Sequence, residues 1–281
     1  MPSLTNKIDF AVIFSAKNAN PNGDPLNGNR PRQNYDSYGE VSDVCLKRKL
    51  RNRLQAMGEK IFVQSDENRA EGDEHRSLNA RFEAAIKGEN KKLDIAKFAS
   101  EKWFDVRAFG QVFAFKGKKD DAEGSDSVSI GIRGPVTIQS AFSIEPITTE
   151  SLQITKSVNL ETNEKQPEKK GPDTMGMKHR VNKAIYVTYG AINTQLASKT
   201  GFSDADSEKI KESLKTLFRD DASSARPEGS MEVLKVIWWK HGNLNGQYSS
   251  AKVHKSLKVN LDGTYELGKF EDLIPEEIDG E

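Results

Sequence analysis

Cysteine and long apolar runs are nearly absent from this sequence, and each absence excludes a class of protein. Cys45 is the single cysteine among 281 residues, so the chain forms no internal disulfide and holds no zinc–thiolate cluster. No apolar run reaches the length of about eighteen residues that a membrane helix needs. The first residues, MPSLTNKIDFAVIFS, lack the basic flank, apolar core and cleavage site of a secretory signal. We therefore expect a soluble, cytoplasmic protein with no membrane partner.

Signatures of metal and nucleotide chemistry are also missing. The four histidines have neither HExxH nor HxH spacing: they are His75, His179, His241 and His254. The phosphate-binding pattern GxxxxGK[ST] does not occur, so ATP is not indicated. We expect no metal and no cofactor.

Charge is balanced overall but segregated along the chain. The sequence holds 42 basic and 42 acidic residues, for a formal net charge of zero. Residues 271–281, EDLIPEEIDGE, contain six acids and no base. Five bases gather within residues 47–53: Lys47, Arg48, Lys49, Arg51 and Arg53. The neutral total therefore conceals local fields of opposite sign.

The first sixty residues predict a strand, a loop and a helix. The apolar, β-branched run at 7–16 predicts a strand, and the Asn-, Gly- and Pro-rich segment 18–34 predicts an irregular loop whose side-chain amides bond backbone or a ligand. Ser42 stands where an N-cap belongs and Asp43 lies in the first turn. We expect a helix from about 43 to 57 that ends near Gly58.

The remaining segments complete an α+β pattern. We expect an insertion at 61–127 with helices at 78–87 and 92–103 and an exposed loop at 117–127. We also expect strands at 136–144, 184–196 and 231–240, a protruding basic arm at 155–180, and an amphipathic helix at 203–218. Two interleaved strand–helix–strand units of this kind are typical of ferredoxin-like folds.

The basic helix raises the question of what its cations contact. Leu46, Leu50, Leu54 and Met57 form one apolar stripe that we expect to pack on the sheet, with the bases on its two shoulders. A solvated helix face is the ordinary interpretation. The helix has almost no acid four residues away from these bases, however, so we expect an external polyanion to relieve their repulsion. A nucleic-acid phosphate backbone would do so.

Four sequence blocks together resemble a known family. NPNGDPLNGNRPR (20–32), VSDVCLKRKLRNRL (41–54), DVRAFGQVF (105–113) and IRGPVTIQSAFSIEPI (132–147) resemble the backbone subunit of type I-C CRISPR Cascade, in the RAMP superfamily. The blocks occur in the family's order, and the resemblance extends to about residue 245. Any one block alone would be weakly specific.

The resemblance implies a fold and a set of partners. It implies a modified RNA-recognition-motif palm at 1–60, 128–147 and 181–245, fingers at 61–127 and a thumb at 148–180, followed by a C-terminal extension with an acidic tail at 246–281. It implies a non-enzymatic protein of a prokaryotic cytoplasm whose copies form a helical filament along one CRISPR RNA and present the spacer to a target DNA strand. The implied protein partners are the 5′-end cap subunit, the large subunit and the small subunit of Cascade.

The resemblance also implies RNA-binding residues. The basic helix and the loop before it grip the RNA backbone, and the thumb returns near two methionines and a lysine that can wedge against a base. These residues are Asn20, Asn22, Arg30, Lys47, Arg48, Arg51, Met175, Met177 and Lys178. The aromatic signature of ordinary RNA-recognition motifs is missing, so we do not expect bases to stack on the open sheet.

Several alternatives stay open at this point. Phe109 and Arg133 are further RNA-binding candidates, although the Asp–Arg pair beside Phe109 is equally typical of a structural corner. Gln139 is more typical of a polar strand face. Asp24 could centre a metal-dependent ribonuclease, because backbone subunits of other CRISPR classes cut RNA with a loop aspartate, but an Asp in NGDP is more often a turn-former. A protein-only assembly subunit is the third possibility.

Overall fold

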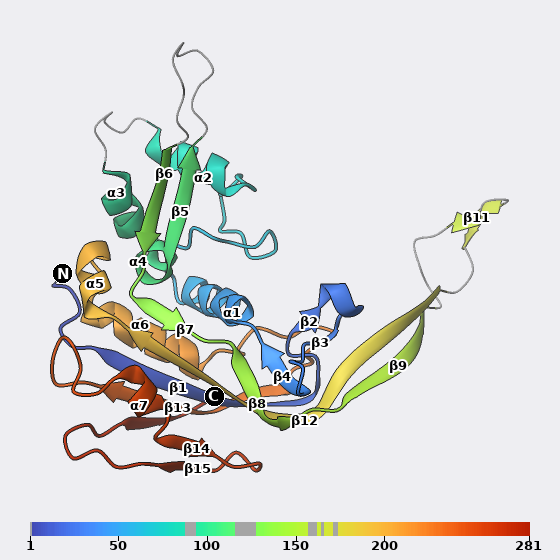
Figure 1. Ribbon diagram of the computed structural model, residues 1–281. Helices are drawn as coiled ribbons and strands as arrows, with labels where there is room; N and C mark the ends of the chain where they lie inside the picture. The colour runs from blue at the N-terminus through green and yellow to red at the C-terminus, as the bar shows by residue number, and fades with distance from the viewer. Residues whose placement is uncertain (1, 88–93, 116–127, 157–161, 164–165, 171–173) are drawn as a thin grey trace.

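The structure is built around one antiparallel sheet with three appendages. The computed structural model describes residues 2–87, 94–115, 128–156, 162–163, 166–170 and 174–281. Figure 1 shows the sheet crossed by helices, an inserted unit above it, a long two-stranded ribbon at one side and a C-terminal lobe below. The loop predicted at 117–127 lies outside the described residues. No helix in the described part of the chain is long and apolar enough to span a bilayer.

The sheet confirms the predicted α+β class. Its strand order is β16 (Glu276–Asp279), β13 (Met231–Lys240), β1 (Ile8–Ala19), β12 (Thr174–Ile192), β8 (Ala141–Pro146) and β4 (Tyr38–Val41), and the paired strands are antiparallel. β7 (Val136–Ile138) pairs with the far end of β12. The units β1–α1–β8 and β12–α6–β13 interleave, with β12 lying between β1 and β8, as a split strand–helix–strand arrangement requires.

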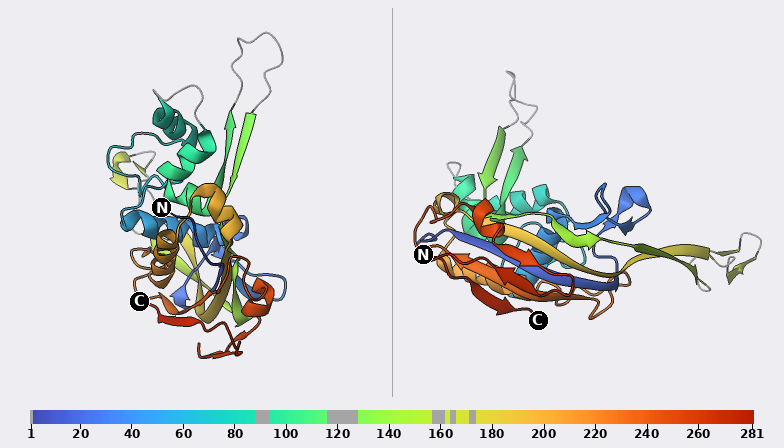
Figure 2. Two further views of the ribbon diagram at one scale, coloured as in Figure 1. Left: turned by 90° about the vertical axis from the view of Figure 1, so that its left-hand side faces the viewer. Right: turned by 60° about the horizontal axis from the view of Figure 1, so that its bottom comes forward.

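Both faces of the three central strands, β13, β1 and β12, are covered. Alternate residues of β1 point to opposite faces, so Phe10, Val12 and Phe14 pack in the core beneath helices α1 (Asp43–Ala56) and α6 (Asp204–Lys215). Ala11 and Ile13 pack on the opposite face, against α7 (Ser250–His254), β14 (Leu257–Val259) and β15 (Tyr265–Leu267). Figure 2 shows this C-terminal lobe on the side of the sheet away from α1 and α6.

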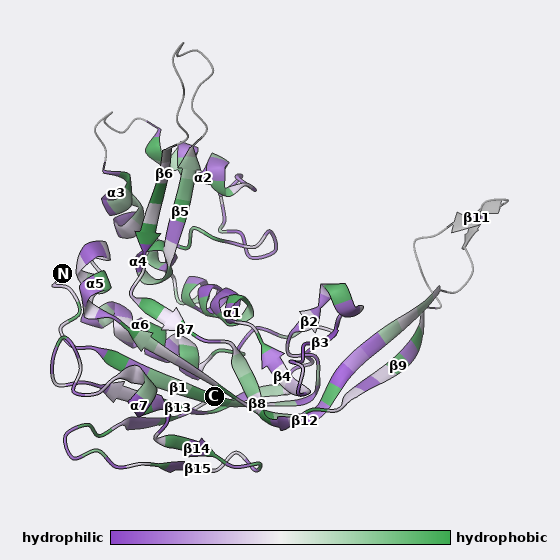
Figure 3. Cartoon of the chain, in the orientation of Figure 1, coloured by the Kyte–Doolittle hydropathy of each residue, from purple (hydrophilic) through white to green (hydrophobic). Residues whose placement is uncertain are grey.

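The two main helices begin where the sequence predicts. The Ser42 side chain accepts a hydrogen bond from the amide of Cys45, and α1 ends at Ala56 with Met57 as its C-cap. Ser203 and Asp206 form a reciprocal capping box at the start of α6. Hydrophilic and hydrophobic residues alternate along α1 (Figure 3), and Leu46, Leu50 and Leu54 are buried as expected.

The inserted unit has its own aromatic core. It contains α2 (Leu78–Ile86), α3 (Ile95–Lys102), α4 (Phe104–Phe109) and the hairpin of β5 (Gly110–Phe115) with β6 (Val128–Arg133). Gly110 has φ 81° and lies so close to the carbonyl of Ile132 that a side chain there would collide with it. Because β6 pairs with β5 throughout, the unit continues to Arg133, beyond the predicted boundary at 127.

The predicted basic arm is a ribbon. β9 (Thr149–Lys156) pairs with the first residues of β12, from Thr174 to Val181, and this β9–β12 ribbon extends away from the body of the molecule (Figure 1). Short strands β10 (Thr162–Asn163) and β11 (Gln166–Lys170) pair with each other beyond it. The ribbon falls within residues 148–180, which the sequence analysis predicts as the thumb.

Several local predictions were wrong. Segment 18–34 is ordered as β2 (Gly23–Asp24), a 3-10 turn at Pro25–Asn27 and β3 (Arg30–Pro31), because β2 pairs with β3. The strand predicted at 136–144 is two strands, and residues 194–196 begin helix α5 (Thr194–Thr200). The acidic tail forms the edge strand β16, where Glu276 lies 2.8 Å from Lys211 and Asp279 lies 2.5 Å from Lys235.

Candidate nucleic-acid interface

The cations of α1 pair with acids of this same chain. Lys47 lies 3.0 Å from Asp43, one turn back on the helix. The other shoulder of α1 faces residues 216–226: Lys49 pairs with Asp221, and Arg53 lies 3.1 Å from Asp220. The expectation that these bases lack acidic partners was therefore wrong. Asp43 was a local partner within the helix, and the other acids come from distant parts of the sequence.

Arg48 and Arg51 fasten α1 to the inserted unit. Arg51 lies 3.0 Å from Asp105, whose carboxylate is fully buried and also accepts hydrogen bonds from the amides of Phe62 and Val63. Arg48 donates to the carbonyl of Val63. Burial and the nearby charge of Arg51 lower the pKa of Arg48 from its ordinary value. Both guanidinium groups therefore join α1 to the inserted unit, a structural role that was not predicted from the sequence.

The asparagine-rich segment is held by its own amides. The side-chain oxygen of Asn22 accepts bonds from the amide and the hydroxyl of Ser42, at 3.0 and 2.9 Å, which ties the segment to the N-terminus of α1. Asp24 accepts a bond from the amide of Leu26 and lies 3.6 Å from Arg32. These contacts are those of turn-forming residues.

Three predicted residues do meet, in a hollow at the root of the ribbon. The hollow has a volume of about 350 Å³ and is lined by Asn20, Asn29, Ile154, Met177, Lys178, His179, Ser224 and Ala225. It brings Asn20, Met177 and Lys178 together although they are far apart in the sequence. Ser224 and Ala225 were not predicted as site residues, because their Ser-, Pro- and Gly-containing loop gives only a turn signal.

Asn20 closes the floor of this ribbon-root hollow. Its amide donates to the carbonyl of Ala225 and its side-chain nitrogen donates to the carbonyl of Asn29, both at 2.8 Å. The residue is only 3% exposed, and its side-chain oxygen has no hydrogen-bond partner among the described residues. Asn20 therefore positions the asparagine-rich segment beside residues 224–225.

The ribbon carries exposed apolar side chains on both faces. Paired residues of an antiparallel ribbon point to the same side, so Met175 and Met177 share one face with Gln153, whose amide nitrogen lies 2.9 Å from the sulfur of Met175. Leu152 and Ile154 share the other face with Lys178. Met175 is 74% exposed and Met177 is 53% exposed. A two-stranded ribbon with this much uncovered apolar surface is suited to contact a ligand or partner.

Arg30, Phe109 and Arg133 lie outside this hollow. Arg30 is exposed on β3, and among the described residues its side chain bonds only the carbonyl of Asn27, at 3.4 Å. Phe109 is partly buried, with the Arg51 guanidinium 5.0 Å from its ring centre, which favours the structural-corner interpretation. Arg133 ends β6 and is exposed, and no ion pair or hydrogen bond joins its side chain to the described residues.

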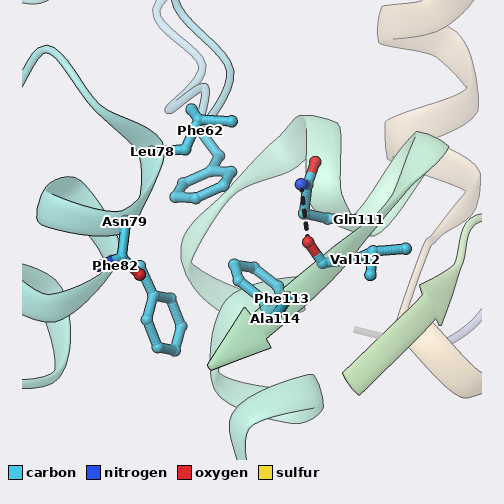
Figure 4. A pocket seen from close by; sticks show the side chains of 8 residues that line it. All are labelled: Phe62, Leu78, Asn79, Phe82, Gln111, Val112, Phe113 and Ala114. Carbon is cyan, nitrogen blue, oxygen red and sulfur yellow. Dashed lines mark hydrogen bonds between the residues drawn. The ribbon is translucent and has the colours of Figure 1, made fainter. Parts of the chain in front are cut away.

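A second hollow, of about 180 Å³, lies in the inserted unit (Figure 4). Its lining includes the rings of Phe62, Phe82 and Phe113 and the amide side chains of Asn79 and Gln111. Phe62 and Phe82 each pack on both Phe113 and Trp103, with ring centroids 4.6 to 6.3 Å apart. Because the rings are almost fully buried, they serve as the core of the unit and offer no free face for stacking.

Metal-binding geometry is not found in the described part of the chain. No group of three or more His, Cys, Asp or Glu side chains there is placed to hold a metal ion. His241 and Asp9 do meet, at 2.8 Å, but they are buried beneath the C-terminal lobe, where Lys7 also contacts Asp9 at 3.0 Å. This cluster fastens the lobe to the sheet.

Comparison with known proteins places these features in a family. The family model described as CRISPR-associated protein Cas7 matches residues 6–276. A Haloferax volcanii protein described as CRISPR-associated protein Cas7 is 24% identical over 278 residues, covering 96% of this chain and 80% of the relative.

Two solved structures are also similar. A chain of a CRISPR RNA-guided surveillance complex, pre-nicking, has a TM-score of 0.45 and 14% identity, covering 83% of this chain and 78% of that chain. A chain of a CRISPR RNA-guided surveillance complex has a TM-score of 0.44 and 15% identity, covering 92% of this chain and 77% of that chain.

Proposed function

Because the chain belongs to the family of CRISPR-associated Cas7 proteins, we propose that it is a non-enzymatic backbone subunit that binds guide RNA within a type I surveillance complex. The family match over residues 6–276 carries this proposal. We assign the I-C subtype on the four sequence blocks described above. Copies of the chain line the RNA, contact the cap, large and small subunits, and leave the spacer free to pair with a target DNA strand.

The geometry supports two roles for the candidate residues: some bind RNA directly, and others position the residues that do. Arg30, Lys178 and Arg133 have no ion-pair partner in the described residues and bind phosphates directly. Lys47 can exchange its half-exposed partner Asp43 for a phosphate. Arg48, Arg51 and Asn22 instead hold the helix and loop that present those groups, so their part in RNA binding is indirect. Met175 and Met177 contact the bases.

The first test is a salt titration of RNA binding. Arg30→Ala and Lys178→Ala should each weaken the binding of unrelated single-stranded RNAs and reduce the salt slope by about one unit or less, since each removes one phosphate contact. Lys258→Ala on β14 is the matched control, because it removes an exposed lysine from the C-terminal lobe. Equal effects of all three variants would contradict the proposed interface. Sizing the RNA that co-purifies with the wild-type protein tests the proposal independently.

The competing function is an RNA cleavage centred on Asp24. The contacts of Asp24 with Leu26 and Arg32 favour its role as a turn-former. We expect labelled complementary RNA to stay intact when the assembled complex is incubated with a divalent metal ion. Regular cuts that disappear in Asp24→Ala would replace the scaffold proposal with a nuclease.

A further inference from the structure

Tyr35 projects into solvent, unlike every other tyrosine of the chain. All six tyrosines are described, and the other five are buried or half-buried. Tyr35 has a relative exposure of 109%, and no hydrogen bond or ring contact joins its side chain to the described residues. A single exposed aromatic is ordinary by itself, so its meaning depends on how it is held and what lies around it.

The turn that carries Tyr35 is closed by several hydrogen bonds. The side-chain oxygen of Asn34 accepts bonds from the amides of Asp36 and Tyr38, at 3.0 and 2.9 Å, and the amide of Ser37 donates to the carbonyl of Asn34. Ser37 has φ 66°, which non-glycine residues adopt at a cost. Tyr35 is thus carried by a tight Asx turn. Its backbone therefore loses little conformational entropy when the ring binds a ligand.

The turn is also tied to the root of the ribbon. The side-chain nitrogen of Gln33 donates to the carbonyl of Ile147 at 3.0 Å, and the amide of Ile147 donates to the carbonyl of Ser37 at 2.8 Å. Ile147 lies in the two-residue connection between β8 and β9. Figure 1 shows this region, between β3 and β4, beside the start of the ribbon. The turn that carries Tyr35 is therefore bonded to the segment from which the ribbon starts.

The charges around the turn are mixed. Arg30 is exposed on β3, and Arg32 is half-exposed, 3.6 Å from Asp24. Asp36 is an exposed carboxylate directly after Tyr35. The adjacent acid makes the tip itself a poor phosphate site, whereas a neutral aromatic face attracts bases regardless of their sequence.

We propose that Tyr35 is a stacking platform for one unpaired base of the RNA strand, with the neighbouring phosphates held by the cations of β3 and the ribbon. This inference rests on the proposed function. It differs from stacking on the sheet, whose central strands are covered on both faces. The ligand class is any purine or pyrimidine in a single strand, because every base offers a π-face.

The test uses the full chain and a labelled single-stranded RNA short enough for one copy. Tyr35→Ala should weaken binding about 5-fold to 150-fold, the range that base–aromatic stacking supplies, with the salt slope unchanged. Tyr35→Phe keeps the ring and should bind within about twofold of the wild type. Leu261→Ala, which removes another exposed apolar side chain from the C-terminal lobe, should bind as the wild type does.

A second RNA separates base contact from backbone contact. On an abasic strand with the same phosphates, the wild type and Tyr35→Ala should bind equally. Wild-type affinity of Tyr35→Ala on ordinary RNA would overturn the inference, and so would an equal loss on both RNAs. A change in the sedimentation of Tyr35→Ala without RNA would make the ring a protein contact instead. If the wild type binds no RNA, the proposed function itself fails.

Discussion

Asp105 joins α1 to the inserted unit through its ion pair with Arg51. Its carboxylate is fully buried, neutralises the charge of Arg51 and accepts two backbone hydrogen bonds. Asp105→Ala removes the partner of the mostly buried Arg51 guanidinium and of two amides, so the free energy of unfolding should fall by about 3–5 kcal/mol. Denaturant titration of the purified chain measures this loss. Asp66→Ala is the control, because it breaks the exposed pair with Arg76 and should leave the midpoint unchanged. Equal midpoints for all three proteins would contradict the role of Asp105.

The acidic partners of the α1 bases were not predicted because most of them are distant in the sequence. A helix sequence reveals acids one turn away, and Asp43 was the only one near Lys47. Asp105 and Asp221 are separated from their α1 partners by 54 and 172 residues, so only the folded topology brings them together. Asn20, Met177 and Lys178 were identified through the family resemblance, and no periodicity in the sequence indicates that they share a hollow.

At the scale of single elements, the β9–β12 ribbon is the part most easily separated from the core. Lys156 pairs with Thr174, so an Asn-Gly turn can replace residues 157–173 and close a regular hairpin. Because the ribbon buries little of the core, the shortened chain should keep the wild-type unfolding midpoint. We expect it to lose ordered assembly along RNA, visible by electron microscopy. Undisturbed regular filaments would show that the outer part of this arm is not the thumb.

Elements with strong local patterns were predictable from the sequence. The apolar positions Ile210 and Leu214 with the Ser203 cap identified α6, and β13 was predicted at its observed bounds. The protruding arm was predicted, but its strands were not, because their side chains face solvent and no alternation between core and surface marks them. The C-terminal lobe was missed because its short strands are fixed by contacts with the far face of the sheet.

At the scale of the whole molecule, buried titratable groups make stability depend on pH. Burial lowers the pKa of His254, and this outweighs the opposing charge of Asp9, while Lys7 lowers it further. Burial raises the pKa of Asp9 and Asp206, but hydrogen bonds, from His241 and Arg107 among others, lower it more, so each carboxyl ends below its ordinary value. In all three groups the unfolded chain binds protons more readily than the folded chain.

Acid should therefore destabilise the protein in two phases. The folded state loses stability as pH falls from about 6.5, the ordinary pKa of histidine, because His254 is protonated more readily when unfolded. The contribution of Asp9 and Asp206 is complete above about pH 4 and is lost as pH falls through their lowered folded values. Urea midpoints measured from about pH 8 to pH 3 should show both phases. His254→Gln should remove the first phase and keep the second, and an unaltered first phase would contradict this origin.

The covered sheet determines how this molecule can hold a long ligand. Helices occupy one broad surface of the central strands and the C-terminal lobe occupies the other. If the chain binds RNA as we propose, the open surfaces left to the strand are the turns and the root of the ribbon at the edge of the sheet. An RNA bound at such an edge keeps one side exposed along its length, as the proposed pairing with a target strand requires.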